Sequence, residues 1–290
     1  MKFGIIFANT GPFADPRYAA QLGPAVEAAG IESVWTVEHV IWPEQYNSVY
    51  PYHPSGRMPG AEEMDMPDPL IWLAYVAAST KTLRLGTGIL LLPERNPLIV
   101  SKQLATLDKL SGGRLELGIG VGWLEEEFKA LGIPFARRGA RTDEYVEILR
   151  ALWSGESTDF SGEFAEFSGV ISRPTPTQNP LPITVGGHSE PAARRAGRLG
   201  AGFFPGRGSL EEISHLYQVA RATAVDKGND PDAIELSAGH PEGIWKEPGR
   251  KIEELRAIGV SRIIFPAYQL LRPDFETALA SFKSDVLAAV

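Results

Sequence analysis

Residues 83–132 read LRLGTGILLLPERNPLIVSKQLATLDKLSGGRLELGIGVGWLEEEFKALG, and this stretch decides the fold class. An apolar, β-rich run over 83–89 precedes a helical pattern that opens at Pro97, and a second β-rich run follows over 114–117. Glycines mark the ends of both runs, at Gly86, Gly88, Gly118, Gly120 and Gly122. This order predicts a βαβ unit, whose two strands lie parallel in one sheet.

The two glycine clusters stand at the carboxyl ends of successive predicted strands. Glycine has no Cβ, so the backbone there can take unusual conformations and a ligand can approach the main chain closely. Because α/β folds bind ligands at that end of their strands, the clusters favour a flat or phosphorylated ligand against the backbone. Tight strand-to-helix turns without any ligand are the alternative.

The same alternation continues along all 290 residues. β-rich runs are predicted at residues 3–8, 33–37, 83–89, 114–117, 183–185, 202–204, 234–237 and 262–265. Helical patterns follow at residues 16–29, 69–79, 97–110, 125–131 with 142–153, 191–199, 210–226, 251–258 and 275–289. Eight strand–helix pairs predict an α/β fold, a (β/α)8 TIM barrel in which residues 1–290 form a single domain.

Two segments interrupt the alternation and are expected to be insertions outside the barrel. Residues 41–67, after strand 2, are rich in proline and aromatic residues and follow a strand end on the rim where barrel enzymes bind substrates. We interpret this segment as a candidate substrate lid, with a proline-pinned surface loop as the alternative. Residues 154–182, before strand 5, contain a possible hairpin, TDFSGEFAEFSG, at 158–169.

Composition excludes several classes of protein. Apolar residues make up 43% of the chain, enough for a large core, and the net charge of −8 argues against nucleic acid as a partner. We expect a cytoplasmic protein without membrane attachment, because MKFGIIFANTG predicts a first strand and no apolar run approaches the roughly eighteen residues of a membrane helix. Since the chain has no cysteine, any redox chemistry needs a bound cofactor.

Glu38 and His39 follow the second predicted strand and are the candidate catalytic residues. Neighbouring strand positions point to opposite faces, so a regular strand would aim only one of them at the pocket. Histidine titrates nearest neutral pH, which makes His39 the best general acid or base; a histidine that only donates hydrogen bonds is the alternative. The five histidines have no metal-ligand spacing and Gly-x-Ser-x-Gly is absent, so we expect neither a metal nor a serine nucleophile.

The stretch ITVGGHSEPAARRAG, residues 183–197, places two glycines and a candidate N-cap residue, Ser189, ahead of a predicted helix. Exposed N–H groups and the helix dipole favour an anion there, whereas Glu190 opposes one unless it points to solvent. Arg207, after the next predicted strand, is a candidate phosphate partner. A capped helix without a ligand is the alternative.

Taken together, these motifs resemble those of luciferase-like flavin-dependent oxidoreductases, particularly the branch that depends on coenzyme F420. The resemblance covers nearly the whole chain and rests on EHV at 38–40, LRLGTGILLLPERNP at 83–97, ATLDKLSGGRLELGIGVGWLEEEFKALG at 105–132, RRGARTDEY at 137–145 and PITVGG at 182–187. It implies a (β/α)8 barrel that binds a flavin or deazaflavin at its carboxyl face, and a homodimer.

The resemblance also implies roles for particular residues. Gly88 and Ile89, followed by Leu90, match a bulge where relatives hold a cis peptide bond behind the flavin ring. His39 matches a pocket histidine near the reacting carbon, and Glu38 a position where relatives often carry aspartate. The other implied cofactor contacts are Gly122, Trp123 and Glu126 near the ring, and Gly186, Gly187, His188 and Ser189 in the phosphate loop, with Arg207 beside it.

The implied activity is hydride transfer between coenzyme F420 and a small organic substrate, with His39 handling a proton. Three alternatives stay open: a monooxygenase that uses flavin mononucleotide (FMN), a non-catalytic barrel that binds a flavin-like ligand, and an isomerase or aldolase for phosphorylated sugars. The last would need a lysine or a carboxylate pair on the rim, and no lysine ends a predicted strand.

Overall fold

Eight parallel strands close into a barrel, as the sequence predicts, in this computed structural model, which describes residues 1–269 and 275–289. The barrel strands are β1 (Lys2–Ile6), β2 (Ser33–Thr36), β3 (Arg84–Thr87), β5 (Leu115–Gly120), β8 (Ile183–Gly186), β9 (Gly202–Phe204), β10 (Leu236–Gly239) and β11 (Val260–Pro266). Pairing of β3 with β5 and of β1 with β11 closes the ring. The two-residue strand β4 (Leu90–Leu91) follows β3 in the chain and, like β3, pairs with β5.

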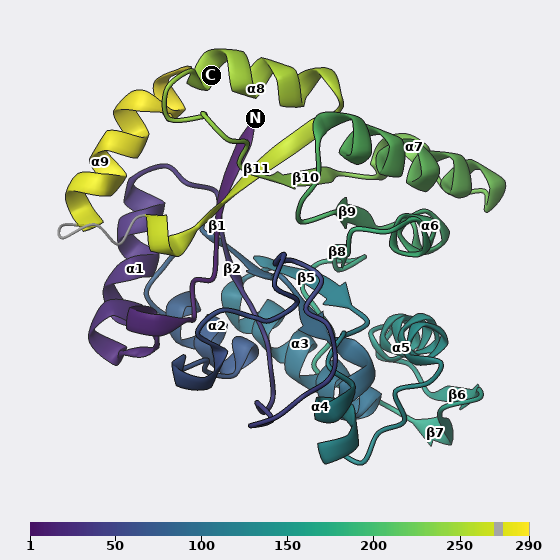
Figure 1. Ribbon diagram of the computed structural model, residues 1–290. Helices are drawn as coiled ribbons and strands as arrows, with labels where there is room; N and C mark the ends of the chain where they lie inside the picture. The colour runs from purple at the N-terminus through teal and green to yellow at the C-terminus, as the bar shows by residue number, and fades with distance from the viewer. Residues whose placement is uncertain (270–274, 290) are drawn as a thin grey trace.

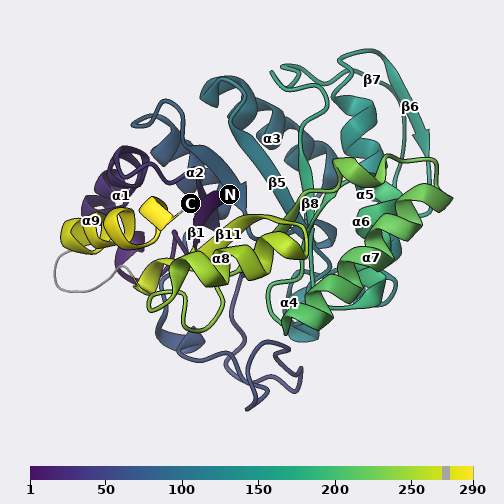
Figure 2. The ribbon, with the colours of Figure 1, turned by 90° about the horizontal axis from the view of Figure 1, so that it is seen from above.

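Helices surround the strands on the outside (Figures 1 and 2). They are α1 (Pro16–Ala28), α2 (Pro69–Ala77), α3 (Pro97–Ser111), α4 (Glu125–Ala130), α5 (Arg138–Leu152), α6 (Glu190–Leu199), α7 (Leu210–Asp226), α8 (Pro248–Ala257) and α9 (Phe275–Asp285). Short 3-10 helices are η1 (Gly11–Ala14), η2 (Ala61–Glu63), η3 (Leu92–Glu94), η4 (Pro231–Ala233), η5 (Ala267–Gln269) and η6 (Leu287–Ala289). No helix in the described ranges is long and apolar enough to span a membrane.

Local sequence sets many of the helix ends. Asp15, Asp68 and Asn96 each precede a proline, and their side chains accept hydrogen bonds from the first backbone N–H groups of α1, α2 and α3. Gly112 and Gly200 end α3 and α6 in the left-handed conformation that glycine adopts without a steric penalty.

Two helices begin earlier than predicted. Helix α8 starts at Pro248 and not at residue 251, because proline fits the first turn, where its missing N–H is not needed. Helix α5 starts at Arg138 and not at residue 142; the polar RGAR segment has no apolar period, yet Arg141 is buried and donates to the Pro134 carbonyl. Strand β10 starts at Leu236, two residues later than predicted, because η4 ends only at Ala233 and Ile234 caps it.

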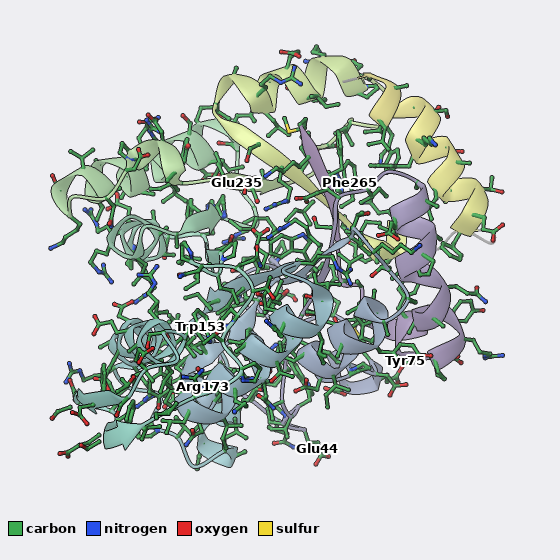
Figure 3. All side chains as sticks on the ribbon, turned by 180° about the vertical axis from the view of Figure 1, so that it is seen from behind. Glu44, Tyr75, Trp153, Arg173, Glu235 and Phe265 are labelled. Carbon is green, nitrogen blue, oxygen red and sulfur yellow. The ribbon has the colours of Figure 1, made fainter. Side chains whose placement is uncertain are left out.

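The predicted hairpin outside the barrel is present as β6 (Thr158–Ser161) and β7 (Glu166–Val170), which pair antiparallel. It lies against α5, where the Glu144 carboxylate accepts the N–H groups of Glu163, Phe164 and Ala165. Figure 3 shows Trp153, at the end of α5, and Arg173, after the hairpin, on this same side of the molecule. The second insertion, residues 41–67, contains only η2.

Several rim glycines make room for the barrel's own side chains. A Cβ on Gly86 would lie 2.4 Å from the Trp35 ring, and one on Gly120 would lie 1.6 Å from Cδ1 of Ile89. A Cβ on Gly118 would lie 1.8 Å from the Thr87 carbonyl oxygen. The sequence-based interpretation that these glycines expose backbone to a ligand is therefore wrong for Gly86, Gly118 and Gly120, because internal packing already requires them.

Candidate active site

His39 lies at the carboxyl end of β2, and its ring is paired with a buried glutamate. Its Nδ1 is 2.7 Å from Oε2 of Glu127 on α4, and the glutamate side chain is 0% exposed. The indole rings of Trp42 and Trp123 meet the imidazole edge-on, with centroid distances of 5.0 and 5.7 Å. The His39 side chain keeps 10% of its surface exposed, so it is held on three sides and still reaches solvent.

Glu38 points away from His39 and does not serve the pocket as the sequence suggested. Its Oε2 accepts the backbone N–H of Leu91 at 2.6 Å, and its Oε1 accepts Nε of Arg95 at 3.0 Å and also Nη2 of the same residue. Arg95 in turn donates to Asp68 at 3.0 Å. Both carboxylate oxygens are therefore engaged, and Glu38 ties the end of β2 to β4, η3 and α2.

Glu94, the last residue of η3, is a buried carboxyl group without a hydrogen-bond partner. Its exposed fraction is 6%, and neither side-chain oxygen has a partner among the described residues. Burial, followed by the charges of Glu127 and Glu38, raises the pKa of Glu94 to about 9. At neutral pH the site therefore holds Glu94 as a neutral acid close to the His39–Glu127 pair.

An aromatic wall, formed by Trp42, Tyr46, Tyr50 and Trp123, stands beside His39. Trp123 from the loop after β5 packs at 5.8 Å from Tyr46 and 5.1 Å from Tyr50, measured between ring centroids. The indole nitrogen of Trp42 is buried without a partner in the described part of the chain. Segment 41–52 thus brings aromatic rings to the mouth, as a lid would, and leaves one hydrogen-bond donor unused.

Glu126 holds the same segment in place. Its Oε1 accepts the N–H groups of Asn47 at 2.6 Å and Ser48 at 3.3 Å, and its Oε2 accepts the Ser48 hydroxyl at 2.7 Å. These bonds lower the pKa of Glu126 against the opposing effect of burial. The residue expected at the ring edge is engaged by the loop, and a contact with a cofactor stays a prediction.

The peptide bond between Gly88 and Ile89 is cis, the geometry that the resemblance implies. The Ile89 side chain lies between Gly120 and Gly186, where a Cβ on either glycine would approach it within 2.5 Å. Leu90 is 0% exposed and pairs with Ile119, so it lies behind the mouth, and its contact with a cofactor stays a prediction. Gly122 has φ of +77° and packs against Phe128.

The predicted phosphate loop lies at the amino end of α6. Ser189 caps the helix through the N–H of Ala192, and Gly187 has φ of +133°. His188 has a buried Nδ1 with no partner in the described ranges. Glu190 is turned outward, 2.6 Å from Nη2 of Arg194 and 3.2 Å from Nε2 of His215, which removes the electrostatic objection to an anion here.

Arg207 completes this corner of the site. It is exposed, lies next to Gly208, and Gly208 packs against the His188 ring. Within residues 1–269 and 275–289 it forms no ion pair, and its guanidinium lies 5.8 Å from the centroid of Tyr52. A helix start, an unpartnered buried imidazole nitrogen and a free cation fit a phosphate or another anion.

Three features together fit a planar cofactor with a phosphorylated tail. They are the aromatic wall, the Ile89 side chain between Gly120 and Gly186, and the anion corner formed by Ser189, His188 and Arg207. His188 Nδ1 and Trp42 Nε1 are buried polar atoms without partners among residues 1–269 and 275–289, and buried polar groups are normally hydrogen-bonded. No group of three or more His, Asp or Glu residues in the described ranges is arranged to hold a metal ion.

Sequence reasoning missed Glu127, Glu94 and Arg95. One pattern could have revealed Glu127: Leu124 and Phe128 form the buried face of α4, and Glu127 falls on that face at helical spacing. No local pattern distinguishes Glu94 from an exposed glutamate in a short polar turn. Its burial depends on tertiary packing, because η3 lies against α5.

Comparisons with known proteins agree with this geometry. The family model described as luciferase-like monooxygenase matches residues 1–244. An uncharacterized protein of Mycobacterium tuberculosis is 32% identical over 298 residues, which is 100% of both chains. An F420-dependent glucose-6-phosphate dehydrogenase of Amycolatopsis mediterranei is 30% identical over 73% of this chain and 59% of its own. An FMNH(2)-dependent dimethylsulfone monooxygenase of Pseudomonas putida is 33% identical over 52% of this chain and 43% of its own.

Solved structures share the fold. A monooxygenase from Streptomyces bottropensis superposes with a TM-score of 0.77 at 24% identity, covering 99% of both chains. The coenzyme F420-dependent tetrahydromethanopterin reductase of Methanopyrus kandleri superposes with a TM-score of 0.77 at 18% identity, covering 99% of this chain and 98% of its own. These likenesses establish the barrel architecture, and the family includes both F420- and FMN-dependent members.

Proposed function

Since the chain belongs to the family of luciferase-like monooxygenases, whose enzymes are oxidoreductases, we propose that it transfers a hydride between coenzyme F420 and a small organic substrate. The observation that carries the proposal is His39, held on buried Glu127 at a barrel mouth that ends in an anion-binding corner. When bound, the deazaflavin supplies the hydride chemistry, and the protein supplies orientation and electrostatics.

The residues of the chain divide this work between two places. Ser189, His188 and Arg207 would bind the phosphorylated tail, and Ile89 would support the ring. His39 would exchange a proton with the substrate through Nε2, because its Nδ1 already faces Glu127. The aromatic wall would exclude water from the reacting atoms.

The alternative is an FMN-dependent monooxygenase on the same scaffold, and the similarity to the dimethylsulfone monooxygenase favours it. The anion corner would accept the FMN phosphate equally well, so the residues of this site do not discriminate between the two cofactors. A barrel that binds either cofactor without turnover is the third candidate.

Equilibrium titration of the cofactor-free protein with F420 and with FMN, followed by anaerobic turnover of the reduced cofactor with candidate acceptors, separates these functions. We expect tighter binding of F420 and turnover without oxygen. Preference for FMN together with oxygen consumption would favour the monooxygenase. Binding without turnover would favour the silent barrel, and failure to bind either cofactor would exclude all three.

His39→Ala tests the proton step directly. We expect kcat to fall about 10²- to 10⁴-fold, the usual contribution of a general acid or base, while cofactor affinity changes less than about threefold. Steady-state kinetics and a binding titration on the same preparation give both values. An unchanged kcat would remove His39 from the mechanism.

A further inference from the structure

We propose that Glu127 is the positioning residue of this site and that its single carboxylate both orients the His39 ring and holds Val40 and Ile41, where the 41–52 lid segment begins. The inference rests on the proposed function, because it takes His39 as the acid or base. It goes beyond that function by connecting the state of the lid to the orientation of the histidine.

The two oxygens of Glu127 have separate tasks. Oε2 lies 2.7 Å from Nδ1 of His39, and Oε1 accepts the backbone N–H groups of Val40 at 2.5 Å and Ile41 at 3.2 Å. Because the side chain is 0% exposed, no solvent competes for these bonds. A carboxylate in this position selects the tautomer that carries its proton on Nδ1, which leaves Nε2 available at the mouth.

The hydrogen bonds to Val40 and Ile41 explain how the Glu127 carboxylate can both orient His39 and hold the lid segment. Val40 and Ile41 follow His39 directly and lead into Trp42, whose ring packs against the imidazole at 5.0 Å. Moving residues 40–42 would break both hydrogen bonds to Oε1 of Glu127. The same movement would take the Trp42 ring away from His39. The orientation of His39 and the closed position of residues 40–42 are therefore coupled through Glu127.

Other charged groups around His39 do not duplicate this role. Glu38 and Arg95 bind each other, and Glu126 binds Asn47 and Ser48. Arg138 of α5 donates to the Gly122 carbonyl. Glu94 is neutral at pH 7, since burial raises its pKa to about 9, so it does not add a second negative charge beside the histidine. Glu127 is the carboxylate left to pair with His39.

Neighbouring Glu126 provides a matched control. It stands on the same helix and also accepts N–H groups of the lid segment, but it does not contact His39. If Glu127 acted only by holding the lid, Glu126→Gln and Glu127→Gln would have similar effects. If it orients the histidine, only Glu127→Gln would change the imidazole.

Nitrogen-15 NMR of the cofactor-free protein tests this, with the His39 resonances assigned by comparison with His39→Asn. In the wild type and in Glu126→Gln we expect the Nδ1–H tautomer of neutral His39. In Glu127→Gln and Glu127→Leu we expect a mixture or the Nε2–H tautomer. The Leu variant preserves apolar packing, and a thermal melt confirms that each variant is folded.

Kinetics with the loaded enzyme give the second readout. We expect kcat of Glu127→Gln to fall about 10- to 100-fold with KM nearly unchanged, as for residues that orient an active-site ligand or base. An unchanged tautomer in both Glu127 variants would overturn the proposal, as would an equal tautomer change in Glu126→Gln. Because NMR needs no cofactor, failure to bind F420 or FMN would refute the proposed function and leave this test intact.

Discussion

Two buried charged clusters lie at opposite ends of the barrel, and they differ in how completely their hydrogen bonds are made. The lower cluster centres on Arg262, near the amino ends of the strands. The upper cluster, around Glu127 and Glu94, lies at the mouth. Figure 3 shows these two ends the other way up: Glu235, just before β10, marks the end of the lower cluster near the top of the picture, and Glu44, on the lid segment, marks the mouth at the bottom.

In the lower cluster every nitrogen of the Arg262 guanidinium donates. Nε and Nη2 donate to Glu32 at 3.0 and 3.1 Å, and Nη1 and Nη2 donate to Glu116 at 2.9 and 3.0 Å. Nη1 also reaches the Ser237 hydroxyl at 3.3 Å. Burial alone would lower the pKa of Arg262, but the charges of Glu116 and Glu32 outweigh it and raise the pKa. This cluster is complete without any ligand.

In the upper cluster the protein leaves polar atoms unused. Both oxygens of Glu94 and the indole nitrogen of Trp42 are buried with no partner in the described chain. Unpaired buried polar groups cost about 1–3 kcal/mol each, so a fold gains nothing from them by itself. The contrast indicates that the amino end of the barrel is arranged for stability and the carboxyl end for binding and chemistry.

The largest expected effect comes from breaking the lower cluster. Arg262→Met would remove the cation bonded to Glu32 and leave Glu116 only its longer ion pair with Arg84 at 3.6 Å, and we expect the free energy of unfolding to fall by about 3–5 kcal/mol. Urea denaturation of the two proteins measures it. The double variant Arg262→Met with Glu116→Gln should recover part of the loss, because the buried charge is then also removed. A loss below about 1 kcal/mol would contradict a stabilising role for this cluster.

Glu94→Gln is expected to have an intermediate effect on the free energy of unfolding, and this effect depends on pH. The folded pKa of Glu94 is about 9, above the value near 4.5 of an exposed glutamate, so the unfolded chain releases a proton that the folded chain keeps. This group's contribution to stability is fully present below pH 4.5 and is lost as pH rises towards 9.

Glutamine cannot ionise, so the variant should escape that loss. We expect Glu94→Gln to gain about 3 kcal/mol relative to wild type between pH 5.5 and pH 8, measured from urea midpoints at both pH values. A parallel pH dependence of the two proteins would mean that Glu94 is ionised and satisfied in the folded state, which would weaken the contrast between the two clusters.

The smallest expected effect concerns the anion corner. Arg207→Gln removes an exposed cation that has no carboxylate partner in residues 1–269 and 275–289, so stability should not change measurably. Affinity for a phosphorylated cofactor should fall about 10-fold, equivalent to about 1.4 kcal/mol, the size of one charge-assisted hydrogen bond. Arg256→Gln, an exposed arginine on α8, is the control. Equal losses in both variants would place the anion elsewhere.

Much of the fold could be predicted because it depends on short-range patterns. Proline after Asp15, Asp68 and Asn96 fixes three helix starts, and apolar runs locate the eight barrel strands. Errors occurred where tertiary packing overrides local preference, as at Arg141, which is buried and lies over the Phe164 ring. The glycine clusters were located correctly but explained incorrectly, because the sequence does not reveal that Trp35 and Ile89 fill the space beside them.

The candidate site was predicted less completely. His39 and the loop before α6 were singled out by their positions after strands, which topology brings to one rim, whereas Trp123 was implied by the family resemblance. Glu38 was assigned to the pocket because strand alternation cannot say which of two neighbours meets an arginine 57 positions away. Glu127 contacts His39 across 88 positions, a pairing that depends on how α4 folds back over the mouth.

By itself, the sequence determined the alternation of strands and helices, the two insertions and the family. These follow from periodicity, turn residues and extended motifs, which act over a few neighbouring residues. Only the tertiary structure decided which buried carboxylates are paired, which are left without partners and which one orients His39. Hydrogen bonding and burial depend on groups brought together from distant parts of the chain, and their energies are set by that three-dimensional environment.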